Sequence, residues 1–285
     1  MSVAHPPAGL HRLPDSQYFA IDLPSSSGTK TLLNGTNAHL AAERGVSRVE
    51  TDAFTLGAYL HALLLDPESI STNFITIGER VDRRTREGKA EWEILLRRAG
   101  ISDARTVAQA PVRRIITRPL IAQATAMAQA VRENPAAAQL LNTLSEREIT
   151  IIGEIGSRPA KAKIDGIIRL AGACIVLDVK TTESASPSDF AASAARFGYF
   201  HQAAFYRRLV EQHIGVMDDF IIIAVEKKAP YLTAVYRIPS IAIETADARI
   251  DNLVERWWEV AEGDRTGYAP TIQELEPPRW WLGND

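Results

Sequence analysis

The stretch AKIDGIIRLAGACIVLDVKTT, residues 162–182, decides the fold of this 285-residue sequence. Two runs rich in isoleucine and valine, 162–170 and 174–180, are separated by Ala171-Gly172, and a similar run, 148–155, precedes them. Short runs of this kind between glycine and proline turns are typical of strands that follow one another in hairpins. The stretch therefore predicts a meander of three strands.

The second and third predicted strands carry two acids and a lysine. Asp165 lies thirteen residues before Asp178, and Lys180 follows Asp178 by two. Because side chains alternate along a strand, Asp178 and Lys180 share a face and Val179 points into the core. Carboxylates bind hard divalent cations, to which Glu148 and the Val179 carbonyl can add oxygen ligands, and the ammonium group can position a water. The pattern indicates metal-assisted hydrolysis of a phosphodiester.

Helical periodicity surrounds the meander. It predicts helices over 51–65, over 118–144 with a break near Asn134-Pro135, over 188–197, over 199–212, and one long helix over 241–260. Two further apolar runs, 220–225 and 232–238, are predicted as strands. His61 lies on the first helix, and a spacing of four places Gln202 and Tyr206 on one face of the fourth. We expect one continuous domain with a helical region over 1–145, a core sheet over 146–240, and a C-terminal helix and tail over 241–285.

Composition excludes several classes of protein. The chain is 46% hydrophobic and 24% charged with a net charge of −3, which describes a globular protein and argues against indiscriminate coating of nucleic acid. Cys174 is the single cysteine, so one chain cannot form a disulfide or a four-thiolate metal site. The sequence shows neither a membrane span nor a signal peptide, and we expect a cytoplasmic protein without membrane partners. Basic residues outnumber acidic ones eleven to five over 80–118, a stretch that forms either a solvated helical face or part of a DNA channel.

Several motifs together resemble the PD-(D/E)XK nuclease superfamily, and within it the phage-type exonuclease VIII (RecE-like) family. The chain has LPSSSGTK at 23–30, LGAYLHALLLDPE at 56–68, DVKTT at 178–182 and GYFHQAAFY at 198–206, each similar to a segment of that family. Two departures are visible: Lys163 stands where arginine is common, and no proline precedes Asp165. The resemblance covers most of the chain.

This resemblance implies an α/β (α+β) fold, with a mixed central sheet flanked by helices and a helical N-terminal part. It implies an exodeoxyribonuclease that uses Mg2+ or Mn2+ to degrade linear double-stranded DNA from its ends, 5′ to 3′, for phage-type recombination. A ring-like homo-oligomer and a single-strand annealing protein as partner follow from the same resemblance.

Site residues carry over from the matching positions in three groups. The catalytic residues would be Asp165, Asp178, Lys180, Gln202 and Tyr206, the metal ligands would be His61, Glu148, Asp165, Asp178 and Val179, and the DNA-binding residues would be Ser27, Lys30, Lys163 and Thr181. We add Lys227 and Lys228 as DNA-binding residues from the sequence itself, because they come just after a predicted strand, where they can contact a phosphate backbone.

Other interpretations of these residues stay open at this point. Asp178 and Lys180 can form a surface ion pair, His61 can be a core histidine, and Gln202 with Tyr206 can serve packing alone. Glu146 and Glu154 compete with Glu148 as the third acid. Two other functions also fit: a different PD-(D/E)XK enzyme, such as an endonuclease or repair nuclease, or a catalytically inactive fold that binds DNA.

Overall fold

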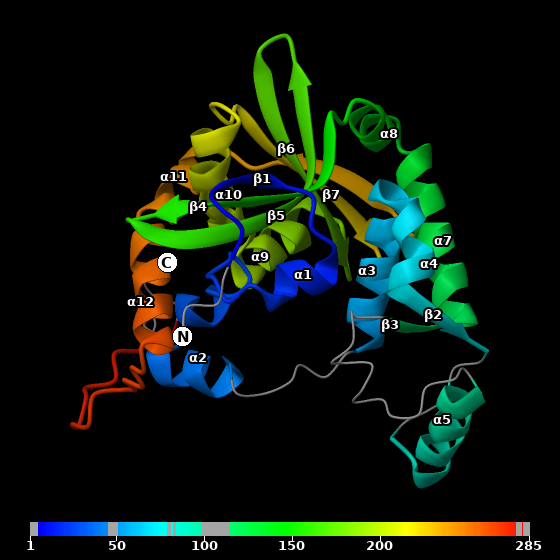
Figure 1. Ribbon diagram of the computed structural model, residues 1–285, viewed down its shortest axis with the longest axis horizontal. Coiled ribbons are helices and arrows are strands. Elements are labelled where there is room, and N and C mark those ends of the chain that lie inside the picture. The colour runs from blue at the N-terminus through cyan, green and yellow to red at the C-terminus, as the bar shows by residue number, and fades with distance from the viewer. Residues whose placement is uncertain are drawn as a thin grey trace.

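The computed structural model of the protein describes residues 5–44, 51–78, 81, 84–98, 114–277 and 281. Its centre is a six-stranded mixed sheet (Figure 1). In spatial order the strands are β1 (Gly9–His11), β4 (Glu146–Ile155), β5 (Arg158–Leu170), β6 (Ala173–Thr182), β7 (Asp219–Glu226) and β8 (Thr233–Arg237). Neighbouring strands are antiparallel except β6 and β7, which are parallel. This arrangement confirms the expected fold class and the three-stranded meander.

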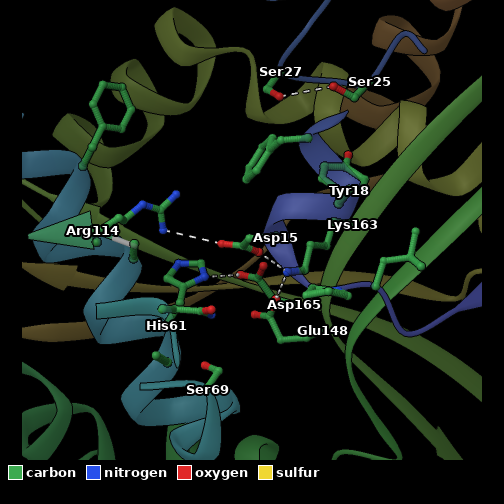
Figure 2. A pocket seen from close by; sticks show the side chains of 18 of the residues that line it. Asp15, Tyr18, Ser25, Ser27, His61, Ser69, Arg114, Glu148, Lys163 and Asp165 are labelled. Atoms are coloured by element: carbon green, nitrogen blue, oxygen red, sulfur yellow. Dashed lines mark hydrogen bonds and ion pairs between the residues drawn. The ribbon is translucent and has the colours of Figure 1, made fainter. Parts of the chain in front are cut away.

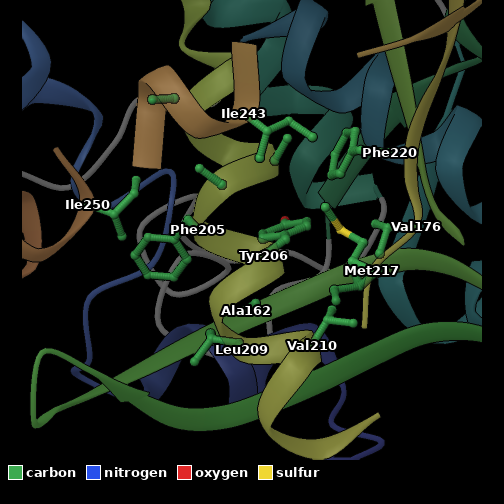
Figure 3. Close-up of a cluster of buried hydrophobic side chains, with 14 of the residues drawn as sticks. Ala162, Val176, Phe205, Tyr206, Leu209, Val210, Met217, Phe220, Ile243 and Ile250 are labelled. Atoms are coloured by element: carbon green, nitrogen blue, oxygen red, sulfur yellow. The ribbon is translucent and has the colours of Figure 1, made fainter. Parts of the chain in front are cut away.

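Helices cover both faces of this sheet (Figure 1). One face packs against α3 (Asp52–Leu65), α7 (Arg118–Glu133) and α8 (Pro135–Asn142), which bury their side chains against Leu177 and Val179. The other face packs against α10 (Tyr199–His213), α11 (Ser240–Asp247) and α12 (Ile250–Ala261). Figure 3 shows this second core, in which Phe205 and Leu209 of α10 lie over the sheet.

Shorter elements complete the described chain. These are the helices α1 (Asp15–Ala20), α2 (Asn37–Arg44), α4 (Ile70–Asn73), α5 (Arg86–Arg98) and α9 (Pro187–Phe197), two 3-10 helices (Lys30–Leu33 and Pro67–Ser69), and a parallel pair of strands, β2 (Phe74–Ile77) and β3 (Arg114–Thr117). No described helix has both the length and the apolar character needed to cross a lipid bilayer.

Helices α9 and α10 form the crossover that a parallel pair of strands requires, because β6 and β7 cannot be joined by a tight turn. The Ser186 hydroxyl caps α9 by accepting a hydrogen bond from the Asp189 N–H, and Pro187 occupies the first helical position. Gly198 then separates the helices with a left-handed φ of +72°. The turn sets the direction in which α10 crosses the sheet.

The sheet forks at the two predicted acids. Pairing between β5 and β6 ends at Gly166 and Leu177, whereas β6 continues to pair with β7 as far as Thr182. Asp165 and Asp178 therefore lie one residue beyond the last paired residues, where the two strands diverge. A fork of this kind lets side chains from both strands reach the same space.

The strand and helix predictions were confirmed with one exception. The expected helix over 241–260 is two helices, α11 and α12, separated by a turn at Ala248 and Arg249. The single-helix prediction was wrong because the two halves pack against different partners, α11 mainly on α10 and α12 on α2. The Arg249 guanidinium also donates a hydrogen bond to the Leu33 carbonyl, which fixes the turn.

The N-terminal part contributes more than helices. β1 pairs with β4, so the central sheet crosses the boundary expected between residues 145 and 146. Within the basic stretch 80–118, part lies on α5 and part on β3, and its members Arg80, Arg83, Arg105 and Arg113 lie outside the described residues.

Replacing Gly198 by alanine should destabilise the protein by about 2 kcal/mol, because a side chain disfavours this left-handed φ. A Cβ at this position would also lie 2.7 Å from the Leu33 side chain. Urea denaturation measures the loss, and Gly172→Ala is the matched control, since Gly172 has a φ of +89° and nothing within 4 Å of its Cβ position. We expect the Gly198 variant to lose more stability than the Gly172 variant; equal losses would show that the contact with Leu33 has no effect.

Candidate metal and nuclease site

Glu148, near the beginning of β4, has a strained backbone. Its φ of +51° lies in the left-handed region, which residues other than glycine rarely adopt. It interrupts the β4–β5 ladder between the pairs Arg147–Gly166 and Ile149–Ile164, and so lies opposite Asp165. Backbone strain of this kind is concentrated at functional sites, where the surrounding structure holds it in place.

Three side chains from three elements converge beside this residue. His61 of α3, Glu148 of β4 and Asp165 of β5 present possible ligand atoms that all lie within 4.8 Å of one another. Figure 2 shows them grouped in one pocket, below Asp15 of α1. Two carboxylates and one imidazole form a donor set suited to a divalent cation, so the residues present fit the metal that the sequence implies.

The Val179 carbonyl orients His61. His61 Nε2 donates a hydrogen bond of 2.8 Å to the Val179 oxygen, so this nitrogen carries the proton. In a neutral imidazole Nδ1 then has a free lone pair, and it faces Asp165 Oδ2 at 3.4 Å. Val179, predicted as a ligand through its carbonyl, thus holds a candidate ligand in position.

Asp165 replaces the missing backbone partner at the fork. The Val179 N–H has no carbonyl partner on β5 beyond the end of the ladder, and it donates to Asp165 Oδ2 at 2.8 Å. Burial raises the pKa of Asp165 to about 6. His61 lowers this pKa, and the Asp178 carboxylate raises it further. A bound cation would favour the charged carboxylate that burial disfavours.

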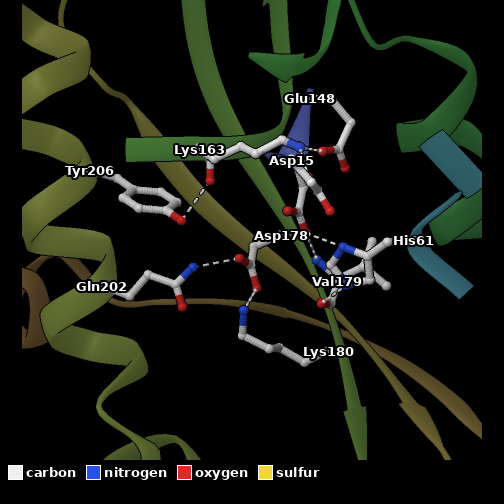
Figure 4. Close-up of polar contacts among 10 residues, drawn as sticks. Asp15, His61, Glu148, Lys163, Asp178, Val179, Lys180, Gln202 and Tyr206 are labelled. Atoms are coloured by element: carbon white, nitrogen blue, oxygen red, sulfur yellow. Dashed lines mark hydrogen bonds and ion pairs between the residues drawn. The ribbon is translucent and has the colours of Figure 1, made fainter. Parts of the chain in front are cut away.

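Asp178, predicted as a metal ligand, is not among the three clustered ligands of the described residues, and instead pairs with the partly exposed Lys180, as Figure 4 shows. Lys180 Nζ lies 2.5 Å from Asp178 Oδ2, and the Asp178 side chain is only 2% exposed. Gln202 Nε2 donates to the other oxygen, Oδ1, at 2.6 Å. Burial alone would lower the pKa of Lys180, but the carboxylates of Asp178 and Asp165 outweigh it and raise the pKa. Lys180 is therefore protonated at neutral pH.

The two predicted residues of α10 hold the two strands of the fork. Gln202 binds the Asp178 side chain of β6, whereas the Tyr206 hydroxyl donates to the Lys163 carbonyl of β5 at 2.7 Å. Burial raises the pKa of Tyr206 well above its usual value, so the hydroxyl remains a donor. Two residues one helical turn apart on α10 thus contact both strands of the fork.

The predicted DNA-binding residues fall into two groups. Ser27, Lys163 and Thr181 line the same open cleft as His61, Glu148 and Asp165. Among the described residues, the lining of this cleft does not include the other three: Lys227 and Lys228 pair with Glu183 at 2.5 and 3.5 Å, and Lys30 Nζ lies over the Phe197 ring.

The cleft has a volume of about 1660 Å3 and is open to solvent. One wall is the sheet, and another is the N-terminal segment with Asp15, Tyr18 and Ser25. This volume exceeds the several hundred cubic ångströms of a typical small-molecule pocket, so the cleft suits an extended ligand.

Sequence reasoning missed helix α1 and the contacts that it makes with β3 and β5. Asp15 forms ion pairs with Lys163 and, at 3.6 Å, with Arg114 of β3. Lys161, buried under the same helix, donates to the carbonyls of Tyr18 and Ile21 at 2.7 and 2.5 Å, and burial lowers its pKa to about 8. The alternation in the sequence KAKID, residues 161–165, was an available signal, because it places both lysines on the same strand face as Asp165.

Comparison with known proteins supports the same fold. A family described as "PDDEXK-like domain of unknown function (DUF3799)" matches residues 25–271. The crystal structure of a protein described as a putative exonuclease from Eubacterium rectale is 14% identical, with a TM-score of 0.62, and the alignment covers 95% of this chain and 98% of that one. At this identity the similarity shows the fold.

Two further solved structures are much less similar. SSO0001 has a TM-score of 0.30 at 17% identity over 73% of this chain and 88% of that one. Protein VC1899 from Vibrio cholerae has a TM-score of 0.24 at 11% identity, covering 85% of this chain and 59% of that one. No curated protein sequence matches significantly.

Asp165→Asn should stabilise the metal-free protein at pH 7 by about 1–3 kcal/mol, because it removes a buried charge that folding disfavours. The folded pKa of about 6 lies above the ordinary value of 3.8, so the wild-type protein should gain stability as the pH falls from 6 to 4. The variant should lack this part of the gain. Thermal denaturation in EDTA across this pH range measures both effects, and a variant less stable than wild type at pH 7 would contradict the prediction.

Proposed function

Since this chain belongs to the family of PDDEXK-like domains, we propose that it is a nuclease that uses Mg2+ or Mn2+ to degrade linear double-stranded DNA from its ends. The observation that carries the proposal is the group of Glu148, Asp165 and His61 in an open cleft, next to the Asp178–Lys180 pair. Clustered carboxylates repel phosphate unless a cation bridges them, so a site that only bound DNA would have no need for this group.

Hydrolysis of a phosphodiester requires a nucleophilic water, neutralisation of phosphate charge and protonation of the leaving oxygen. A divalent cation held by His61, Glu148 and Asp165 would supply Lewis-acid stabilisation and a bound water of lowered pKa. Asp165 must be charged to hold it, which its pKa of about 6 allows at neutral pH.

Lys180 supplies a positive charge from the protein itself. Its ammonium group is protonated and fixed by Asp178, so it can donate a hydrogen bond to the attacking water or to a phosphate oxygen. Gln202 keeps the Asp178 carboxylate in place, and the Tyr206 hydroxyl keeps the β5 backbone in place. Gln202 and Tyr206 therefore act as positioning residues in this proposal.

The exonuclease assignment rests on the resemblance of the motifs to the exonuclease VIII (RecE-like) family. The same resemblance supports 5′ to 3′ degradation for phage-type recombination, a homo-oligomer and a single-strand annealing protein as partner. These parts of the proposal are tested separately, by end-labelled substrates for polarity and by light scattering for the number of subunits.

We expect the wild-type protein to degrade linear duplex DNA in Mg2+ and to lose this activity in EDTA. Lys180→Ala should lower the rate by about a hundredfold or more, because it removes a positive charge at the reacting phosphate. Asp178→Asn should lower the rate by a similar factor, because Lys180 loses the carboxylate that fixes its ammonium group. Asp219→Asn is the matched control, since Asp219 lies at the far end of β7, opposite Ile175.

Closed circular DNA separates the alternatives. Cleavage of closed circles would overturn the exonuclease proposal in favour of an endonuclease. If Mg2+ produces no loss of duplex that depends on Asp178, the proposal of a nuclease fails and a catalytically inactive DNA-binding fold remains.

A further inference from the structure

Asp15 lies between two cationic side chains inside the cleft. Its carboxylate pairs with Lys163 of β5 through one oxygen and lies 3.6 Å from Arg114 of β3 through the other. Figure 2 shows Arg114 and Lys163 approaching the carboxylate from different sides. All three side chains are partly exposed, between 17% and 24%, so a ligand in the cleft can reach them.

The position of Asp15 is fixed by the rest of α1. Tyr18 is buried on this helix, and the Lys161 ammonium group binds the Tyr18 and Ile21 carbonyls at its C-terminal end. Two lysines on one face of β5 thus hold the two ends of the same short helix, Lys161 through the backbone and Lys163 through Asp15. These contacts keep the acidic side chain of α1 in the cleft.

The carboxylate has the charge and the oxygen geometry of the group that the cleft would bind. A phosphodiester carries one negative charge shared between two oxygens, and arginine with lysine is a common pair of partners for it. Lys163 Nζ is also 2.9 Å from Glu148 Oε2, so Lys163 lies directly beside a candidate metal ligand. A phosphate at this position would be a neighbour of the reacting phosphate.

We propose that Arg114 and Lys163 form a binding site for a backbone phosphate of the nucleic acid, and that the Asp15 carboxylate occupies this site until DNA displaces it. The proposal rests on the proposed function, because it names the way in which that site holds its substrate. Asp15 then acts as a competitor for DNA. The same contact places a carboxylate between the positive charges of Lys163 and Arg114.

Fluorescence anisotropy with a labelled duplex tests the proposal, with every variant built on Asp178→Asn so that the DNA stays intact. Asp15→Asn keeps the size of the side chain and removes its charge, and it should lower the Kd about twofold to fivefold, as expected for loss of one competing ion pair. Arg114→Gln should raise the Kd and reduce the slope of log K against log salt by about one, as expected for one phosphate contact. In the Arg114→Gln background, Asp15→Asn should have a smaller effect.

Asp22→Asn is the matched control, because Asp22 lines the same cleft but pairs with Arg44. Tighter binding by both Asn variants to the same extent would overturn the proposal, since it would reflect the general charge of the cleft. Unchanged or weaker binding by Asp15→Asn would also overturn it. Arg114→Lys, which keeps the charge, should retain most of the affinity, and a loss equal to that of Arg114→Gln in a variant with normal thermal stability would argue against a phosphate contact.

These outcomes are separate from those of the proposed function. If the protein degrades DNA and Asp15→Asn binds no more tightly, this inference alone fails. If the binding effects appear without any Mg2+-dependent hydrolysis, the phosphate site stands and the nuclease proposal fails.

Discussion

The hydrogen bond from the Val179 N–H to the Asp165 carboxylate holds the site together. A buried N–H must find an acceptor, and at the fork of β5 and β6 the usual backbone acceptor has moved away. Asp165 takes its place, so the strands can diverge without leaving a buried donor unpaired. The divergence opens the space in which side chains of α3, β4, β5 and β6 meet. The carbonyl of the same residue, Val179, accepts a hydrogen bond from His61 and so fixes the imidazole.

This arrangement lowers the stability of the folded protein. A carboxylate whose pKa is raised by burial, a glutamate with positive φ and the buried charge of Asp178 each make the folded state less stable than a plain apolar sheet would. The surrounding packing compensates, because the apolar cores on both faces of the sheet hold β5 and β6 in place. Strain and buried charge concentrated at one point are typical of a site kept for its chemistry.

The sequence predicted those parts of the fold and site that depend on local periodicity. The alternation in DVK placed Asp178 and Lys180 on one face, and the spacing of Gln202 and Tyr206 placed both on one side of α10. Contacts between distant segments were not predictable in this way, since Asp15 and Lys163 are 148 residues apart and no repeating pattern joins them. The break between α11 and α12 was missed for the same reason, because the partners that separate the two helices lie elsewhere in the chain.

Lys163 connects the two kinds of charge in the cleft. Its ammonium group pairs with both Glu148 and Asp15, one a candidate metal ligand and the other the proposed competitor of phosphate. A cation bound by Glu148 would compensate the negative charge that Lys163 compensates in the structure. A phosphate would replace the Asp15 carboxylate as a partner of Lys163. Binding of a cation and binding of DNA should therefore favour each other. A cation on Glu148 takes one carboxylate away from the Lys163 ammonium group, and this group can then pair more strongly with a phosphate of the DNA. The slight net negative charge of the chain is compatible with a DNA substrate in this arrangement, since acids in the cleft are paired locally with the cations that the substrate would use.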